Sequence, residues 1–176
     1  MILPDYLAPR LQLVICGTAA GEKSGERGHY YAGPGNEFWK LLFESGLTEP
    51  LRPEEDSQIT KSGIGLTDLA KLVAASSDAG LREHYDVELF IWKIAQFKPA
   101  VVAFHGKEAA KEVSRALGYG RRVQLGRQEW DVAERPVFVL PSASASNRDP
   151  RRLEGKASRL EWFVELRGFA YLTALP

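Results

Sequence analysis

The pattern of apolar and polar residues along the chain alternates between two kinds of segment. Short continuous apolar runs rich in β-branched residues are typical of strands buried on both faces of a sheet. Three runs have this character: Leu11–Cys16, Ala100–Phe104 and Val137–Leu140. Longer segments with apolar residues at every third or fourth position are typical of helices that cover such a sheet. Four segments have this pattern: Asn36–Ser45, Val87–Phe97, Lys107–Leu117 and Leu153–Leu166.

This alternation predicts an α/β fold, namely a three-layer α/β/α sandwich with a short, largely parallel central sheet. Segments 51–62 and 74–80 are polar and are expected to be surface loops. Because the sequence has no internal repeat and no long linker, residues 1–176 are expected to form a single domain. In folds of this kind, ligands bind where the loops gather at the carboxyl ends of the strands.

Composition narrows the class of protein. The 23 Lys and Arg residues balance the 23 Asp and Glu residues, so only local clusters of charge can indicate a nucleic-acid partner. The single cysteine, Cys16, excludes an internal disulfide, and its apolar neighbours favour a buried thiol. No run approaches the roughly 20 apolar residues of a membrane span. The start, MILPDYLAPR, lacks the order of a signal peptide, so we expect a cytoplasmic protein with no membrane partner.

The first candidate binding loop follows the first predicted strand. Gly17 and Gly21 bracket Thr18, Ala19 and Ala20, so the backbone is expected to turn there and expose its amides. The segment contains neither the GxGxxG pattern of dinucleotide sites nor the GK[ST] pattern of phosphate loops. On its own it is a weak indication of function.

The next segment is more informative, because two tyrosines precede a Gly-Pro-Gly turn and a predicted helix. Tyr31 is well placed to stack on a flat ligand, and a position in the core is the alternative. Asn36, at the start of the helix, either caps it or contacts the ligand.

A second candidate loop, PSASASNRDPRR at residues 141–152, follows the last predicted strand. Small residues allow close approach to a ligand, and hydroxyls and arginines suit phosphate oxygens. An exposed serine-rich loop before the last helix is the alternative. Segments 106–127 and 144–167 carry a modest excess of basic residues, compatible with a face that follows a phosphate backbone.

Three titratable side chains are candidates for acid–base chemistry. Asp68, between Thr67 and an apolar stretch, could have a raised pKa and act as a base, or it could cap a turn. His29 and His105 could also take part. No spacing of His, Asp and Glu indicates a metal site, so we expect no metal.

Four blocks taken together resemble a known family. DYLAPRLQLVICG, GHYYAGPGNEFWKLLFESGL, GIGLTDLA and LPSASAS are similar, in this order, to the motifs of the uracil-DNA glycosylase superfamily. The similarity is strongest to its mismatch-specific uracil and thymine-DNA glycosylase branch, and YAGPGNEFWK is the most specific block. The resemblance implies an enzyme without a cofactor that flips a base out of DNA into a pocket.

The resemblance also implies roles for individual residues. Tyr31 corresponds to the aromatic residue that stacks on the base. The implied base pocket consists of Gly17, Thr18, Ala19, Ala20, Tyr30 and Tyr31. In the implied DNA-binding loop, Ser142 and Ser144 correspond to residues that hold the phosphates flanking the flipped nucleotide. The stretch that enters the duplex corresponds to Ala145, Ser146, Asn147 and Arg148.

Two departures from the family pattern change these expectations. Ala19 stands where the branch has the Asn that positions the attacking water, and alanine has no polar side-chain atom. We therefore expect Asp68 to activate water or stabilise the sugar cation, with Asn36 as the second candidate. At the duplex-entering position, Ser146 and Asn147 replace a larger wedge, which predicts weak dependence on the opposite base and tolerance of single-stranded DNA.

These observations leave three hypotheses. The first is a monomeric, monofunctional DNA glycosylase of base-excision repair, acting on uracil and, in a pocket widened by Ala19 and Ala20, on other deaminated bases such as hypoxanthine. Neither Lys23 nor Lys61 is clearly placed as a Schiff-base nucleophile. The second is a protein that binds damaged DNA without cutting it, which the alanine at position 19 favours. The third is a nucleotide-binding α/β domain unrelated to DNA.

Overall fold

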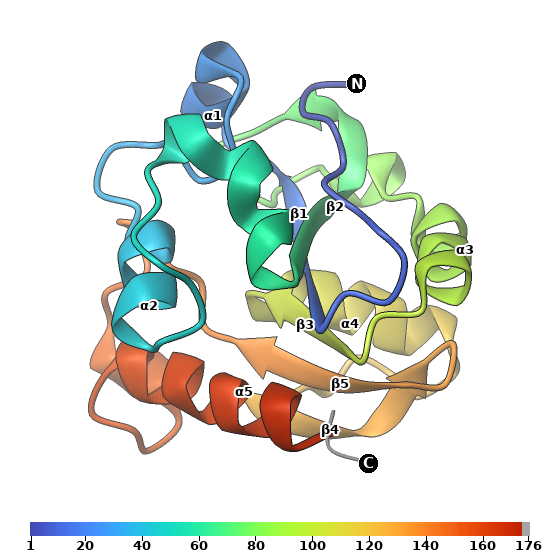
Figure 1. Cartoon of the computed structure of the whole chain (residues 1–176). Coiled ribbons are helices and arrows are strands. Elements are labelled where there is room, and N and C mark those ends of the chain that lie inside the picture. The colour runs from blue at the N-terminus through green and yellow to red at the C-terminus, as the bar shows by residue number, and fades with distance from the viewer. Residues whose placement is uncertain (174–176) are drawn as a thin grey trace.

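The fold was described from a computed structural model, which describes residues 1–173 (Figure 1). A five-stranded sheet has the strand order β2-β1-β3-β5-β4. Its strands are β1 Leu13–Ala20, β2 Ile64–Ala74, β3 Val101–His105, β4 Gly126–Val132 and β5 Arg135–Leu140. β1 pairs in parallel with β2 and β3, β3 pairs in parallel with β5, and β4 is antiparallel to β5. The predicted α/β fold with a largely parallel central sheet is confirmed.

Helices cover both faces of this sheet. α3 and α4 pack together on one face, and α2 and α5 pack together on the other, as Figure 1 shows. The helices are α1 Glu22–Arg27, α2 Phe38–Glu44, α3 Val87–Phe97, α4 Lys107–Ala116 and α5 Arg159–Thr173, with 3-10 segments η1 Pro53–Ser62, η2 Arg82–His84 and η3 Pro150–Leu153. The apolar strand residues lie between these two helical layers and form the core.

The predicted loop after the first strand is wrong, because β1 continues to Ala20. Its neighbour β2 supplies the backbone partners: Gly17 lies opposite Asp68, and Ala19 lies opposite Ala70. We did not predict β2, whose apolar run is interrupted by glycine and polar residues. We also did not predict β4, an edge strand whose outward-facing residues are polar.

The helix ends show where side chains override the apolar pattern. α3 has the predicted bounds and α4 ends one residue early. α2 begins at Phe38, two residues late, because the Asn36 side chain Oδ1 accepts a hydrogen bond from the Phe38 amide at 2.9 Å. α5 begins at Arg159 rather than Leu153, since residues 150–153 form a 3-10 turn and Glu154 follows with a φ of 50°.

Segment 51–62 is not the plain surface loop that its polarity predicted. It contains η1, which buries Ile59 completely and leaves Asp56 only 2% exposed. The Asp56 carboxylate accepts hydrogen bonds from the Tyr30 amide at 2.9 Å and the Tyr6 hydroxyl at 3.0 Å. His29 Nδ1 lies 3.3 Å from the same carboxylate, so His29 holds this segment in place and does not line the cleft described below.

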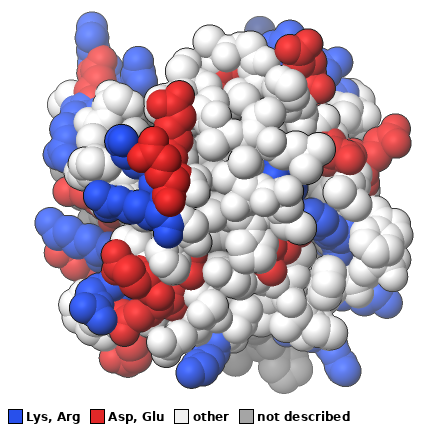
Figure 2. Space-filling view, turned by 90° about the horizontal axis from the view of Figure 1, so that it is seen from above, with Lys and Arg blue, Asp and Glu red and all other residues white. Residues whose placement is uncertain are grey.

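The surface carries charges of both signs. Seen from above in Figure 2, Lys and Arg are interspersed with Asp and Glu around a broad uncharged area. This face therefore carries no field of a single sign. Within residues 1–173, no helix combines the length and apolar character needed to cross a membrane.

Replacing Asp56 should test whether η1 stabilises the fold. In Asp56→Ala, the buried Tyr30 amide loses its acceptor, so we expect the free energy of unfolding in urea to fall by about 1–3 kcal/mol. Glu54→Ala, an exposed change in the same segment, should alter it by less than about 0.5 kcal/mol. Equal effects from the two variants would contradict this role for Asp56.

Candidate active site

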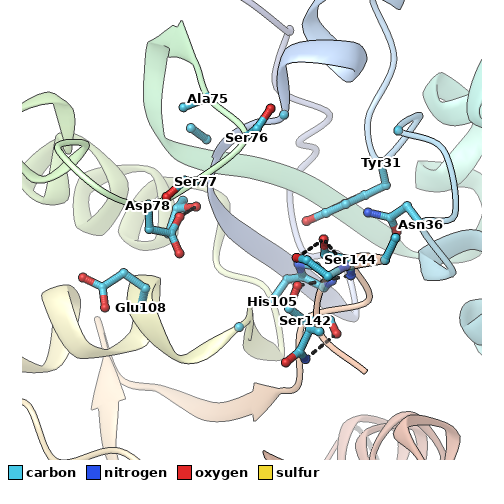
Figure 3. Close-up of a pocket in the computed structure, with 18 of the residues that line it drawn as sticks. Tyr31, Asn36, Ala75, Ser76, Ser77, Asp78, His105, Glu108, Ser142 and Ser144 are labelled. Atoms are coloured by element: carbon cyan, nitrogen blue, oxygen red, sulfur yellow. Dashed lines mark hydrogen bonds between the residues drawn. The ribbon is translucent and has the colours of Figure 1, made fainter. Parts of the chain in front are cut away.

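A large cleft of about 1040 Å³ opens at the carboxyl ends of the parallel strands. Figure 3 shows Tyr31 and Asn36 along one side, His105, Ser142 and Ser144 at the base, and Asp78 and Glu108 on the opposite side. The two predicted binding segments, around Tyr31 and around Ser144, are therefore brought together. The cleft is larger than one nucleobase requires, and it has room for a nucleotide and its neighbours.

Asp68 lies in β2 directly beside Gly17 of β1, and its side chain lines the cleft while only 4% exposed. The carboxylate leans over Gly17: a Cβ added there would lie 2.6 Å from Asp68 Oδ1 and 3.3 Å from the Tyr31 hydroxyl oxygen. Since only glycine leaves this space, Gly17 allows both the carboxylate and the phenol to lie above the strand. Its role is to make room for both groups, because it does not itself line the cleft.

The electrostatic setting of Asp68 suits a base that works near neutral pH. Burial raises the pKa of its carboxyl to about 6, Lys71 and Lys93 oppose this rise, and Asp5 adds to it. The two lysines are themselves held by Asp5, at Nζ–O distances of 2.8 and 2.6 Å. Asp68 is therefore ionised above about pH 6 and, once ionised, can accept a proton.

Tyr31 provides a flat surface in the cleft. Its ring stacks on Phe38, with centroids 3.7 Å apart and planes at 27°, so a ligand can stack only on the opposite face. Its hydroxyl is buried and has no hydrogen-bond partner among residues 1–173. Burial and the nearby Asp68 raise the pKa of this phenol well above its usual value, so it remains protonated.

The other residues assigned to the base pocket are divided between the cleft and the core. Thr18 and Ala19 line the cleft, and Thr18 Oγ1 donates a hydrogen bond of 2.6 Å to Asp78. Ala20 is 5% exposed and lies in the core, away from the cleft lining.

Tyr30 borders the cleft, but its side chain belongs to the core. It is 2% exposed, its hydroxyl donates to the Pro4 carbonyl at 2.9 Å, and it accepts from Lys71 Nζ at 2.8 Å. Its hydroxyl is thus held by the protein, unlike that of Tyr31.

Asn36 lines the cleft and lies just before α2, where its Oδ1 accepts a hydrogen bond from the Phe38 amide. The N-cap residue of α2 is Glu37, so Asn36 forms a turn before the helix and is not the cap that the sequence suggested. Its side-chain amide nitrogen makes no hydrogen bond to the residues described, and its Oδ1 retains one lone pair, so Asn36 can offer a ligand a donor or an acceptor.

The loop after β5 presents a small tip. Ala145 and Ser146 are exposed, whereas Asn147 is folded back: its Nδ2 donates to the Ser142 carbonyl at 2.9 Å, and its Oδ1 accepts from Arg152 at 3.2 Å. Arg148 Nε donates to the Ala145 carbonyl at 3.1 Å. The side chains at the tip are therefore alanine and serine.

Arg159, which the sequence did not single out, holds this loop together. It is 8% exposed, and its Nη1 donates to the carbonyls of Ser142, Ser144 and Asn147 at 3.1, 3.0 and 3.3 Å. Its Nη2 pairs with Glu37, at the start of α2. No local pattern could have revealed this role, because the three carbonyls become neighbours only through the folding of the loop.

His105, at the end of β3, lies between the loop and the aromatic side chains. Its Nε2 accepts a hydrogen bond from the Ala143 amide at 2.8 Å, and its ring centroid lies 4.7 Å from that of Tyr31. Burial and the charge of Arg159 lower its pKa to about 3, so the imidazole is neutral near pH 7. It cannot serve as a cationic acid at that pH.

The fold and the cleft define an α/β domain that holds a flat ring beside a buried carboxylate at the carboxyl ends of its strands. A family model described as the Uracil DNA glycosylase superfamily matches residues 4–167, and the chain belongs to this superfamily. The chain also resembles a solution NMR structure from Methanosarcina acetivorans, of a protein provisionally described as a uracil DNA glycosylase. The identity is 24%, the match covers 94% of this chain and 95% of the other, and the TM-score is 0.59. That likeness confirms the fold, and membership of the superfamily supports a DNA glycosylase role.

Asp68 should reduce stability at neutral pH. Its folded pKa is raised, so the folded protein gives up this proton less readily than the unfolded chain, and stability is lost as the pH rises from about 4 to about 6. We expect Asp68→Asn to increase the free energy of unfolding at pH 8 by about 1–3 kcal/mol, and to have no effect near pH 3, where the carboxyl is protonated in both states. The exposed change Asp131→Asn is the control in the same urea titrations.

Removing the Arg159 guanidinium should loosen the loop. In Arg159→Met, three carbonyls and Glu37 lose their partner, so we expect hydrogen exchange at the Ala143 and Asn147 amides to accelerate by at least about tenfold, the effect of roughly 1.4 kcal/mol. Arg167→Met, an exposed change on the same helix, is the control. Unchanged protection in Arg159→Met would show that the loop holds its shape without this side chain.

Proposed function

We propose that this protein is a monofunctional DNA glycosylase that flips uracil out of DNA, hydrolyses the N-glycosidic bond and leaves an abasic site, acting as a monomer without a cofactor. The observation that carries the proposal is the buried Asp68 carboxylate above Gly17, beside the aromatic face of Tyr31. Superfamily membership makes DNA the natural substrate class for this arrangement.

Asp68 supplies the polar group that position 19 lacks. Ala19 lines the cleft in β1, and Asp68 reaches over the same strand from β2. In the proposed reaction, a flipped base stacks on the free face of Tyr31, and a water molecule lies between Asp68 and the sugar. The C1′–N bond breaks, and its electron pair leaves with the base. The water oxygen bonds to C1′, Asp68 accepts the water's proton, and the base anion is later protonated by solvent.

The DNA-binding loop would hold the phosphates around the flipped nucleotide. Ser142 and Ser144 line the cleft, and Arg151 and Arg152 lie at its rim. The exposed tip of Ala145 and Ser146 is too small to fill the space that a flipped base leaves in a duplex. We therefore expect weak dependence on the opposite base and activity on single-stranded DNA. The size of the cleft supports acceptance of hypoxanthine as well.

Ala19 also favours a second function, a protein that binds damaged bases and does not hydrolyse them. Alanine on the cleft wall cannot position water, so this alternative requires Asp68 to be too far from the sugar to replace the missing group. Both proteins would bind uracil-containing DNA. Only the enzyme would leave an abasic site.

Single-turnover cleavage of labelled uracil-containing DNA, followed by alkali, tests the proposal. We expect strand breaks with the wild type. Asp68→Asn should slow their formation by roughly 10²–10⁴-fold, because the variant lacks the carboxylate that acts as general base. Since the pKa of Asp68 is about 6, the wild-type rate should fall about fivefold between pH 6 and pH 5. Asn36→Ala should have a smaller effect, because the Asn36 side chain is partly engaged with the Phe38 amide.

Asp131→Asn is the matched control and should leave the rate unchanged, because Asp131 is exposed on the outer strand β4. Absence of breaks together with uracil-dependent binding would favour the lesion-binding alternative. Equal rates for Asp68→Asn and the wild type would refute the assignment of Asp68.

A further inference from the structure

We propose that His105 determines which bases the cleft accepts, by presenting a fixed hydrogen-bond donor to the carbonyl oxygen that deamination creates on a nucleobase. The proposal rests on the proposed glycosylase function. In the proposed site, Asp68 performs the chemistry. His105 would select the substrate class, which is deaminated bases with a keto group.

The hydrogen bonding of His105 allows only one tautomer. Its Nε2 accepts the Ala143 amide proton at 2.8 Å, and this bond requires a lone pair on Nε2. The neutral ring therefore carries its proton on Nδ1. No other residue among 1–173 pairs with Nδ1, and the His105 side chain lines the cleft. What His105 offers to a ligand is thus one N–H donor and no acceptor.

The ring is held in place on several sides. Tyr31 packs against it at 4.7 Å between centroids, and Phe38 meets it edge-on at 5.5 Å and 86°. Its charge state is also fixed, because burial and Arg159 keep its pKa near 3. A rigid neutral donor cannot turn its other nitrogen toward the ligand, since doing so would break the bond to Ala143.

The strand order places this donor toward the far edge of the base. Asp68 comes from β2 and His105 from β3, on opposite sides of β1. Tyr31 extends between them, with its hydroxyl near Asp68 above Gly17 and its ring against His105. A base with its sugar at Asp68 and its ring on Tyr31 would direct the edge remote from the glycosidic bond toward His105.

Deamination changes the hydrogen bonding of that remote edge. Cytosine and adenine carry an amino donor there, whereas uracil and hypoxanthine carry a carbonyl acceptor. An amino group facing the Nδ1 proton of His105 would leave two donors opposed, and polar groups left unpaired in this way are a strong basis for rejection. One fixed donor therefore accepts a deaminated pyrimidine and a deaminated purine by the same contact.

The test removes each side of the contact in turn. Single-turnover excision is compared for uracil and for 2-pyrimidinone, which keeps O2 and lacks O4, placed in the same oligonucleotide. We expect the ratio of the uracil rate to the 2-pyrimidinone rate to be roughly 10- to 100-fold higher for the wild type than for His105→Leu, because the variant has no donor for O4. His105→Gln can accept from Ala143 and still donate, so it should restore part of the preference.

His84→Leu, a change of the exposed histidine of η2, is the matched control and should keep the wild-type ratio. If His105→Leu slows both substrates by the same factor, His105 only supports the loop and the inference fails, while the proposed function stands. If the wild type excises neither base, the proposed function fails. In that case, the affinities for the uracil and 2-pyrimidinone oligonucleotides are compared in the wild type and in His105→Leu. An equal affinity ratio in the two proteins would overturn the inference as well.

Discussion

The parallel pairing of β1 with β2 is the constraint on which the candidate site depends. This register places Gly17 opposite Asp68, and the missing side chain at Gly17 leaves room for the carboxylate and for the Tyr31 hydroxyl. A slip by one residue would turn Asp68 to the other face of the sheet. Burial of the carboxylate both raises its pKa and weakens the fold, so the feature that makes it useful as a base also opposes stability.

The rest of the cleft is joined to this strand pair by polar contacts from distant parts of the chain. Arg159 connects α5 to the loop after β5 and, through Glu37, to the start of α2. His105 connects that loop to the aromatic side chains. The segments that would hold a base and a phosphate thus share one set of supports, and a change in either support should affect both.

The sequence predicted the layers of the fold better than the details of the site. The apolar runs around Val14, Val102 and Phe138 identified three strands, because residues buried on both faces leave a continuous signal. β2 was missed because Gly65 and the polar pair Thr67 and Asp68 interrupt its pattern, although these residues are buried. The resemblance pointed to the region of Tyr31 and Asp68, but the position of both groups above Gly17 depends on strand register. The role of Arg159 depends on contacts between distant residues, which no local pattern encodes.

The continuation of β1 to Ala20 has a consequence for how a ligand would be bound. A glycine-rich loop must lose conformational entropy when it closes around a ligand, and this loss weakens binding. Residues 17–20 are instead part of the sheet before any ligand arrives. One wall of the cleft is therefore ordered during folding. Binding of a base consequently carries no conformational-entropy cost for ordering that wall.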